Sequence, residues 1–408
     1  MPRWTDWLSG QVERHPGFWI GLGRWETRAL NERLDDVLID RPVYIAGLAR
    51  SGTTVLLELL AGCANVATHR YRDFPAVLTP WIWSRFWDHA VRTGEQPVER
   101  AHGDRIRITS ESPEAFEEMV WMAFFPEAHD PERSSVLDHR TDHPHFERFY
   151  RDHVRKILLL RDGSRYVAKG NYNLTRLEYL RKLAPDARFV IPVRDPVAHV
   201  ASLARQHERF VGEGRRDDRV RRHLRRSGHF EFGMDRRPIH TGDPAGVDEV
   251  RSLWSEGREI EGWAAYWSLV YAHVLRSLEA SPALADAVSV VRYEDLCSRP
   301  GPVLSSVLAH CQLDGEDAVQ QAEQRVRPPD YYHSPLDDAD VETVRERTRR
   351  VAAALGYGRD RPTADRSGTS GAALAPASAR RGEAAAPPPL PGTPQRSARA
   401  RSSRARRV

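Results

Sequence analysis

The sequence predicts an α/β fold in which a parallel sheet is covered by helices on both faces. Short apolar runs, rich in β-branched and aromatic residues, alternate along the chain with segments of helical periodicity, and this alternation is typical of parallel sheets. The first of these runs ends in a glycine-containing loop that leads into a helix. The chain has 408 residues, 40% of them hydrophobic, which is enough for a sizeable core.

The first predicted elements lie near the N-terminus. Residues 24–38 carry apolar side chains at helical spacing, and Arg41 with Pro42 ends this pattern. Residues 43–47, with the sequence VYIAG, predict a strand, and residues 53–64 return to a helical composition. Together these segments predict a strand, a glycine loop and a helix in succession.

A second series of elements repeats the alternation further along the chain. Strands are predicted at residues 166–171, 187–195 and 287–296, where short apolar runs are followed by polar or charged residues. Helices are predicted at residues 174–184, 196–210 and 263–278, and the second of these begins with a proline in its first turn. The strands are thus separated by helices, as a parallel sheet requires.

Two long stretches interrupt this alternation. Residues 74–150 contain many aromatic and histidine residues with broken periodicity, and residues 206–262 contain clusters of Arg and His. Such excursions commonly form the substrate side of the cleft in α/β folds, although the Arg-rich stretch also fits a solvated helical surface. We therefore expect one domain over residues 1–360, with insertions near 74–150 and 206–262.

The last segment, residues 361–408, is rich in Ala, Pro, Ser and Arg. It carries a net charge of +8, so the other 360 residues account for −4 of the formal +4 of the chain. A segment with almost no large apolar residue cannot bury enough surface to offset its chain entropy, and we expect it to be disordered. The basic balance therefore predicts a solvated tail and no specific nucleic-acid partner.

The cysteines and the N-terminus bear on the compartment. Cys63, Cys297 and Cys311 are widely spaced and form no CxxC pair, which argues against a disulfide framework and against a thiolate zinc site. The N-terminus lacks the apolar core of a signal peptide, and no run of about 18 apolar residues occurs. We therefore expect a cytoplasmic protein with no membrane association.

The loop after the first strand has the glycine spacing of a phosphate-binding loop. Gly47 and Gly52 are separated by four residues, but Thr53 stands where the pattern GxxxxGK[ST] has its lysine, and Arg50 supplies a cation within the loop. Backbone N–H groups and the N-terminus of the following helix can still bind an anion. Hydroxyl groups add further donors at Ser51, Thr53 and Thr54. A loop of this kind suits a donor with a single 5′-phosphate joined to another group.

Residues 47–54, GLARSGTT, resemble the 5′-phosphosulfate loop of sulfotransferases that use 3′-phosphoadenosine 5′-phosphosulfate (PAPS). The resemblance is to the branch in which the loop reads PRSGTT, with Ala49 here in place of the proline. It covers roughly residues 40–300 and implies a P-loop-like three-layer fold, PAPS as the donor and no metal. It also implies donor-binding roles for Arg50, Ser51, Gly52, Thr53 and Thr54.

A second segment supports the resemblance. Arg194 ends a predicted strand, and Ser202 follows eight residues later on the helix that Pro196 opens. This pair is similar to the 3′-phosphate-binding segment of the same enzymes, which implies that Arg194 and Ser202 hold that phosphate. Tyr293, in RYEDL, is similar to a family residue near the adenine, and it is either a base-stacking or a packing residue. The terminal RKG segment of cytosolic aryl and steroid sulfotransferases is not present.

The resemblance implies in-line transfer of a sulfuryl group to a hydroxyl or amine, with cations that stabilise the spreading charge. Arg50 is expected to stabilise the leaving 5′-phosphate. Lys169 is a second candidate for this role, because relatives often have a lysine at this strand end. Alternatively, Lys169 is simply the exposed end of a strand.

The sequence does not decide which residue acts as the general base. This branch commonly has a glutamate about twenty residues after the loop, but Tyr71 occupies that position here. The flanking residues His69 and Asp73 are therefore the candidate bases, the first for its pKa and the second as a carboxylate. His102 and His207 are more distant candidates.

Two other functions stay open from the sequence. A P-loop kinase or nucleotide hydrolase would use ATP and magnesium, and the missing lysine argues against it. A non-catalytic nucleotide-binding protein would need no base. A small-molecule or carbohydrate acceptor is expected, but the sequence does not identify it, because residues 74–150 suit an aromatic or amphipathic acceptor and residues 206–262 an anionic one. The sequence does not determine the oligomeric state.

Overall fold

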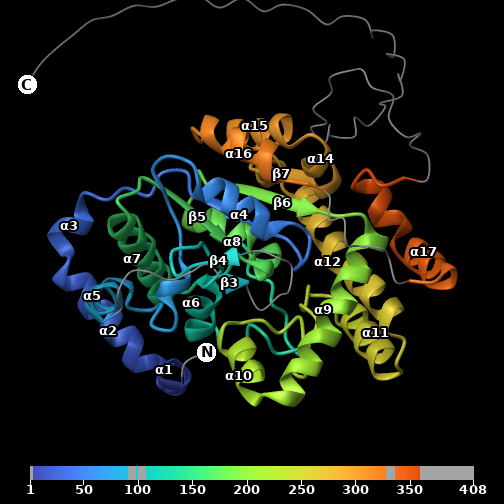
Figure 1. Ribbon diagram of the computed structural model, residues 1–408, viewed down its shortest axis with the longest axis horizontal. Helices are drawn as coiled ribbons and strands as arrows, with labels where there is room; N and C mark the ends of the chain where they lie inside the picture. Colours follow the sequence, from blue (N-terminus) through green and yellow to red (C-terminus); the bar gives the residue numbers. More distant parts are fainter. Residues whose placement is uncertain (1–2, 91–97, 100–106, 328–335, 359–408) are drawn as a thin grey trace, which may run out of the picture. The chain divides into compact units, whose positions relative to one another are not determined.

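A five-stranded parallel sheet positions the functional loops of this protein (Figure 1). The computed structural model describes residues 3–90, 98–99, 107–327 and 336–358. The chain divides into two units, Met1–Ser367 and Gly368–Val408, and the second lies outside the described residues.

The strands of the main sheet lie in the order β2-β5-β1-β6-β7, and all neighbouring pairs are parallel. These strands are β1 (Val43–Ile45), β2 (Val66–Ala67), β5 (Arg165–Lys169), β6 (Arg188–Val193) and β7 (Val288–Arg292). A separate antiparallel pair consists of β3 (Val98–Glu99) and β4 (Arg107–Ile108). In the register, Ile45 lies opposite Lys169 on one side and Val190 on the other. The carboxyl ends of the central strands therefore meet at one edge of the sheet.

Helices cover both faces, because the strand residues alternate between two hydrophobic clusters. Val43 and Ile45 belong to one cluster and Tyr44 to the other. The first face is covered by α4 (Thr53–Ala61), α14 (Tyr293–Ser298), α15 (Pro300–Cys311) and α16 (Glu316–Arg325). The second face packs against α6 (Glu117–Phe124), α7 (Pro144–Arg161), α8 (Leu177–Leu183), α9 (Pro196–Arg216), α11 (Pro244–Ser255), α12 (Glu259–Ala280) and α17 (Asp338–Ala354). The predicted three-layer α/β fold is confirmed.

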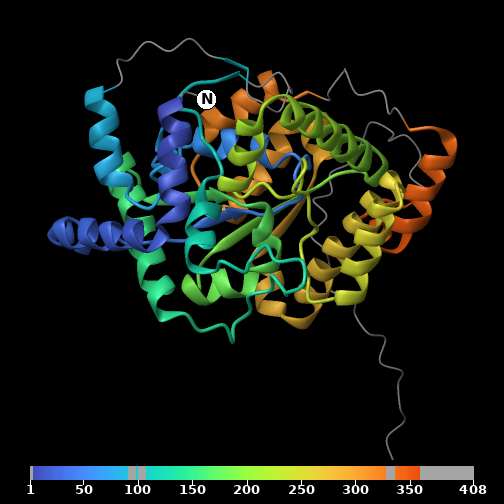
Figure 2. The same cartoon turned by 90° about the horizontal axis from the view of Figure 1, so that it is seen from below.

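The remaining helices lie in the N-terminal part and in the long connections. They are α1 (Arg3–Arg14), α2 (Pro16–Ala29), α3 (Asn31–Asp35), α5 (Pro80–Ala90), α10 (Asp218–Arg226) and α13 (Pro282–Ala285), with 3₁₀ turns at Tyr71–Asp73 and Asn171–Thr175. The helix α10 packs beside α1, where the Arg226 guanidinium lies 2.7 Å from the Asp6 carboxylate (Figure 2). The two stretches predicted as insertions thus hold α5, α6, α10 and α11, the strand pair β3 and β4, and parts of α7, α9 and α12, outside the five strands of the main sheet.

Two predicted elements differ in detail. The helix expected over residues 24–38 is divided at Leu30 into α2 and α3. The strand expected over residues 287–296 ends at Arg292, and Tyr293 already begins α14. Glu294 and Asp295 lie in the first turn of α14, where negative charge stabilises a helix, so the acidic pair favours the helix over a longer strand.

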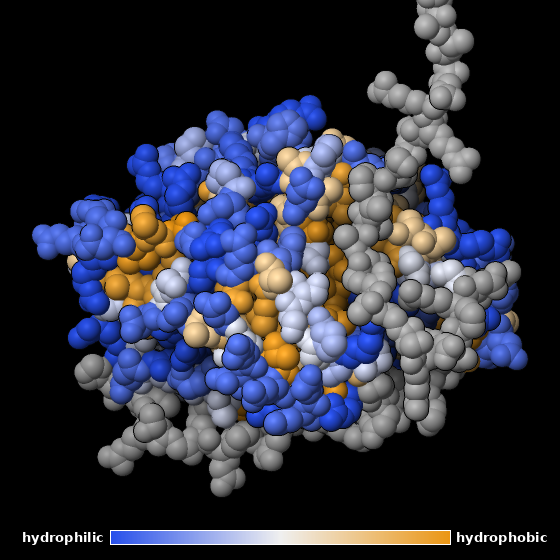
Figure 3. Space-filling view, turned by 90° about the horizontal axis from the view of Figure 1, so that it is seen from above, coloured by the Kyte–Doolittle hydropathy of each residue, from blue (hydrophilic) through white to orange (hydrophobic). Residues whose placement is uncertain are grey.

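The surface carries apolar side chains in several patches between hydrophilic ones, as the view from above shows (Figure 3). Large exposed side chains are present on the first two helices, where Trp7, Phe18 and Trp25 are more than half exposed. None of the helices within the described ranges combines the length and the apolar character that crossing a membrane requires.

Candidate active site

The loop after β1 is held tightly by left-handed backbone positions. Arg50 has a φ of 70° and Gly52 a φ of 104°. The N–H of Ser51 donates to the carbonyl oxygen of Leu48 over 3.2 Å. Thr53 then begins α4, so the N–H groups of its first turn and the positive end of its dipole are directed at the loop. This segment has the geometry of an anion-binding site.

Gly52 is a position where the loop tolerates no side chain. A Cβ atom there would lie 2.6 Å from Cδ2 of Tyr293, and its φ is unfavourable for other residues. We expect Gly52→Ala to lower the free energy of unfolding by about 1–3 kcal/mol, measured by urea denaturation.

The matched control is Gly62→Ala at the other end of α4. Gly62 has an ordinary helical φ of −79°, and its added Cβ would meet nothing closer than 3.4 Å. Gly62→Ala should change stability by less than about 0.5 kcal/mol. Equal unfolding midpoints for the two variants would contradict the described loop geometry.

Two arginines and a serine meet beside the loop. Nε of Arg50 donates to Oγ of Ser202 over 3.3 Å, and NH1 of Arg194 donates to the carbonyl oxygen of Arg50 over 3.3 Å. Arg194 directly follows β6, and Ser202 lies on α9, whose N-terminus is capped by Asp195. The structure therefore brings together Arg50, Arg194 and Ser202, which the sequence predicted as donor-binding residues.

Tyr293 lies at the same loop. Its ring packs against Gly52, and the Arg194 guanidinium carbon is 5.1 Å from the ring centroid, which is within the range of a cation–π contact. The ring therefore packs between the phosphate loop and Arg194. A stacking role on a base stays a prediction.

The buried imidazole of His199 connects the backbone of this loop to α12. The Nδ1 atom of His199 accepts a hydrogen bond from the Trp267 indole over 3.1 Å, so Nε2 carries the proton and donates to the carbonyl oxygen of Ala49 over 2.8 Å. His199 is fully buried, and burial lowers its pKa to about 3. The neutral tautomer is thus fixed under the loop. His199 is not among the residues that the sequence predicts for the site.

Lys169 and a carboxylate lie side by side next to the first turn of α4. Nζ of Lys169 donates to Oγ1 of Thr54 over 3.1 Å and lies 3.7 Å from Oε1 of Glu114. The side chains of Lys169 and Glu114 are 8% and 9% exposed. Lys169 is therefore not an exposed strand terminus but a largely buried cation at the loop.

Glu114 reaches the site because two distant segments pair. The N–H of Tyr71 donates to the carbonyl oxygen of Ser112, and the N–H of Glu114 donates to that of His69, both over 3.0 Å. Tyr71, which occupies the position where the resemblance implies a glutamate, donates its hydroxyl to the Glu114 carboxylate. The carboxylate thus comes from 43 residues further along the chain. Glu114 is absent from the residues that the sequence predicts.

His69 and Asp73 lie in a buried network under this pairing. Nδ1 of His69 is 3.5 Å from Oδ2 of Asp73, Nε2 of His69 is 3.1 Å from Nε2 of His153, and Asp73 pairs with Arg161 of α7. Burial alone would raise the pKa of Asp73, but the hydrogen bond with His69 and the charge of Arg161 hold it below its usual value. Both residues are 1% exposed. These contacts hold the segment 69–73, which carries Tyr71, against α7.

A second pair of ionisable groups approaches the same site. Nδ1 of His229 lies 3.1 Å from Oε1 of Glu231, and this oxygen also accepts from Nδ2 of Asn171 over 2.9 Å. Burial alone would lower the pKa of His229, but the Glu231 carboxylate outweighs this effect and holds it above its usual value. Glu114 raises the pKa of His229 further, and Lys169 opposes the rise, so the four charges share one environment. His229 and Glu231 are also absent from the sequence prediction.

His207 and a group of possible metal ligands lie away from the loop after β1. His207 faces Arg236, and burial and the nearby Arg236 charge lower the pKa of His207 to about 4. His102 is outside the described residues. Within the part of the chain that the structure describes, one group has the spacing of cation ligands, namely Asp138, His139 and Glu178. It includes none of the predicted donor-site residues.

Comparison with known proteins identifies the central segment. A protein-family model described as "Sulfotransferase family" matches residues 42–237, just under half of the chain. This segment contains the phosphate loop, Glu114, Lys169, Arg194 and Ser202, whereas Tyr293 lies beyond it. No curated protein matches the sequence.

Solved structures of bacterial proteins are similar at low identity. Sulfotransferase STF1 from Mycobacterium tuberculosis H37Rv shares 17% identity, with 80% of each chain covered and a TM-score of 0.45. Sulfotransferase STF9 from Mycobacterium avium shares 14% identity, with 84% of each chain covered and a TM-score of 0.45. A sulfotransferase from Alicyclobacillus acidocaldarius shares 15% identity, with 78% of this chain and 97% of that chain covered and a TM-score of 0.38.

Proposed function

We propose that this chain transfers a sulfuryl group from PAPS to a hydroxyl or amine of a small-molecule or carbohydrate acceptor, and the match of residues 42–237 to the sulfotransferase-family model supports this. The observation that carries the proposal is the contact of Arg50 with both Ser202 and Arg194 at a loop that lacks the ATPase lysine. A donor with a 5′-phosphosulfate and a 3′-phosphate needs cations at both ends, and these residues supply them.

We assign the two ends of the donor as follows. The 5′-phosphosulfate is bound by Arg50, by the backbone and hydroxyl donors of residues 51–54, and by the dipole of α4. The 3′-phosphate is bound by Arg194 and Ser202. Tyr293 lies against both Gly52 and Arg194, so it closes the pocket between the two ends or stacks on the adenine.

The chemistry is an in-line displacement at sulfur. The acceptor oxygen or nitrogen forms a bond to sulfur, the bond between sulfur and the 5′-phosphate oxygen breaks, and the acceptor proton leaves to a base. Arg50 and Lys169 stabilise the charge on the equatorial oxygens and on the leaving phosphate, which is where positioned cations contribute most.

We propose Glu114 as the general base in preference to His69 and Asp73. Its carboxylate lies 3.7 Å from the Lys169 ammonium, beside the first turn of α4, where a base must be to reach the acceptor. His69 and Asp73 contact His153 and Arg161 of α7, so we propose that they support the segment 69–73 and do not act as the base. In this proposal, Glu114 takes the role of the glutamate that the resemblance implies at position 71. Tyr71, which occupies that position, donates a hydrogen bond to the Glu114 carboxylate.

Titration calorimetry tests the donor. We expect adenosine 3′,5′-bisphosphate to bind with at least about 100-fold higher affinity than ATP with magnesium, because the loop lacks the lysine that grips the β- and γ-phosphates. Preference for ATP would favour a kinase or hydrolase. Binding of the bisphosphate without sulfuryl transfer to any acceptor, followed as an 80-dalton mass gain, would favour a non-catalytic binding protein.

We also propose that residues 1–360 form the transferase domain and that residues 361–408 are a solvated tail without a nucleic-acid partner, as their composition indicates. A cytoplasmic location is supported by Cys63, Cys297 and Cys311, which are free and buried thiols.

A further inference from the structure

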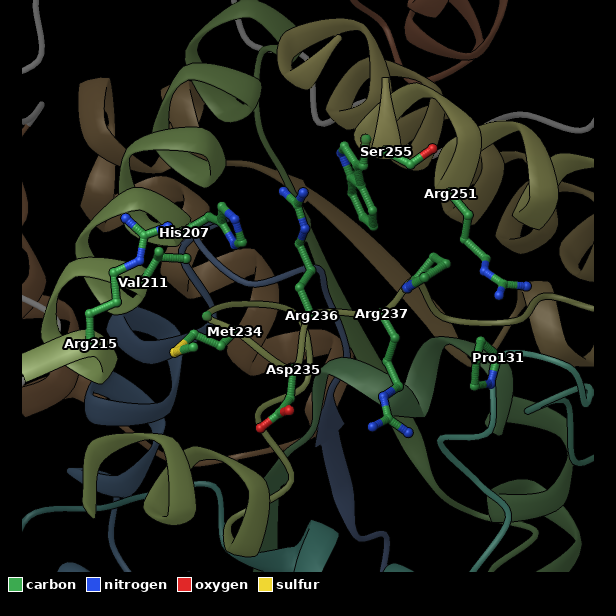
Figure 4. Close-up of a pocket in the computed structure, with 13 residues that line it drawn as sticks. Pro131, His207, Val211, Arg215, Met234, Asp235, Arg236, Arg237, Arg251 and Ser255 are labelled. Atoms are coloured by element: carbon green, nitrogen blue, oxygen red, sulfur yellow. The ribbon is translucent and has the colours of Figure 1, made fainter. Parts of the chain in front are cut away.

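A recess of about 860 Å³ lies between α9 and α11. His207 and Arg215 line it from α9, Arg251 and Trp254 from α11, and the segment 233–238 forms the part between them (Figure 4). The lining is strongly basic, since it contains four arginines and one carboxylate, Asp235. Nothing in the donor site uses these residues.

The carboxylates around the recess neutralise only part of this charge. Arg221 takes both oxygens of Asp235 over 2.7 Å each, Glu259 pairs with Arg236, and Glu132 lies 2.6 Å from Arg251. Among the described residues, no carboxylate lies within ion-pair distance of Arg215 or Arg237, the other two lining arginines.

Arg237 is held in place by a carbonyl oxygen and an aromatic ring, and the Asp235 carboxylate is near it but outside ion-pair distance. Its NH1 donates to the carbonyl oxygen of His129 over 2.8 Å, and its guanidinium carbon lies 4.6 Å from the centroid of the Phe230 ring. A guanidinium fixed in this way is prepared for an oxyanion, because little side-chain entropy is lost on binding.

An aromatic wall completes the recess. The Arg236 guanidinium carbon lies over the Trp254 ring, 4.0 Å from its centroid, in a cation–π contact. Met234 lines the same space and is half exposed. The combination of an apolar wall with two guanidinium groups that form no ion pair among the described residues suits a ring compound that carries an anionic group.

The recess begins close to the reacting groups. Gly233 lines it and follows Glu231 by two residues, so their Cα atoms are at most about 7 Å apart. Glu231 contacts Asn171 and His229, and His229 responds to the charges of Glu114 and Lys169. The recess therefore begins within about 7 Å, between Cα atoms, of a residue that contacts Asn171 and His229 beside the proposed transfer site.

We infer that the recess binds an anionic group, a carboxylate or a sulfate, of a ring-containing acceptor, and that Arg237 and Arg215 bind it. The acceptor role rests on the proposed function. The recess determines which acceptors are sulfated.

Calorimetry with three glycosides tests the inference on the full chain. The probes are 4-nitrophenyl β-D-glucuronide, the matching neutral glucoside and its 6-sulfate. We expect the glucuronide or the 6-sulfate to bind at least about 10-fold more tightly than the neutral glucoside, and the tighter of the two distinguishes a carboxylate site from a sulfate site. Arg237→Gln combined with Arg215→Gln should remove this difference.

The control is Arg219→Gln, an arginine of α10 that pairs with Asp217 and does not line the recess. It should leave the affinity ratio unchanged. If the double variant does not fold, Arg215→Gln alone, at an exposed position, should lower the ratio by at least about 3-fold. Equal affinities for all three glycosides, or a ratio that survives the double variant, would overturn the inference.

Adenosine 3′,5′-bisphosphate is titrated into the same samples. An anion preference that depends on Arg237 without bisphosphate binding retains the anion site and rejects the donor assignment. Bisphosphate binding without an anion preference retains the donor assignment and rejects the recess.

Discussion

Arg50→Ala is expected to reduce kcat/KM for sulfuryl transfer by about 10²–10³-fold, because it removes a positioned cation from the oxygens on which negative charge develops. The guanidinium is oriented by Ser202, and its backbone oxygen is held by Arg194. The loss should therefore appear in kcat as well as in affinity. Steady-state rates with saturating and limiting donor separate the two effects.

Three further variants test whether the effect depends on the charge and position of Arg50. Arg50→Lys keeps the charge but loses the fork geometry, so it should recover only part of the rate. Arg194→Ala should weaken binding of the bisphosphate by at least about 10-fold, because the proposed site places Arg194 at the 3′-phosphate. Arg24→Ala, at an exposed position of α2, should change nothing measurable. Full bisphosphate affinity in both Arg50→Ala and Arg194→Ala would remove the two residues from the donor site.

Glu114→Gln is expected to lower kcat by about 10²–10⁴-fold while it leaves the affinity for the bisphosphate within about 2-fold. Glutamine has nearly the same volume and still accepts the Tyr71 hydroxyl, so only the proton acceptor is removed. The measurement is kcat at saturating donor and acceptor, beside calorimetry with the bisphosphate.

Glu111→Gln is the matched control, since it changes an exposed carboxylate of the same segment that pairs with Arg70 and Arg72. It should retain the rate of the unaltered protein. His69→Gln and Asp73→Asn should lower the free energy of unfolding by breaking buried contacts. If either lowers only kcat while Glu114→Gln remains active, the base belongs to the residue it alters.

The residues of the proposed donor site could be found from the sequence because they fall in two short segments, each with a recognisable local pattern, which the neighbouring strands β1 and β6 bring together. Arg50 lies in the loop between a strand and a helix, and Arg194 and Ser202 are joined by one helical stretch. Local spacing therefore carries the geometry. The same holds for Lys169, which ends a strand that pairs with β1.

The positions of Glu114 and His199 depend on contacts between distant segments, which no local sequence pattern predicts. Glu114 reaches Lys169 only because its segment pairs with the backbone of residues 69–72. Its signal in the sequence is indirect, namely a tyrosine where a carboxylate is expected. His199 likewise meets Trp267 from 68 residues away. Side chains that are brought together by packing of this kind cannot be assigned from spacing.

The imidazole beneath the phosphate loop has a consequence in acid. The unfolded chain binds a proton at His199 below about pH 6.5, whereas the folded chain does not until about pH 3. The unfolded state is therefore favoured by up to about 1.4 kcal/mol for each pH unit across this window as the pH falls. The residues that touch the donor need not titrate for binding to be lost. His199 contacts the loop through the carbonyl oxygen of Ala49, and its protonation favours the unfolded chain. We therefore expect donor binding and the folded state to be lost together as the pH falls.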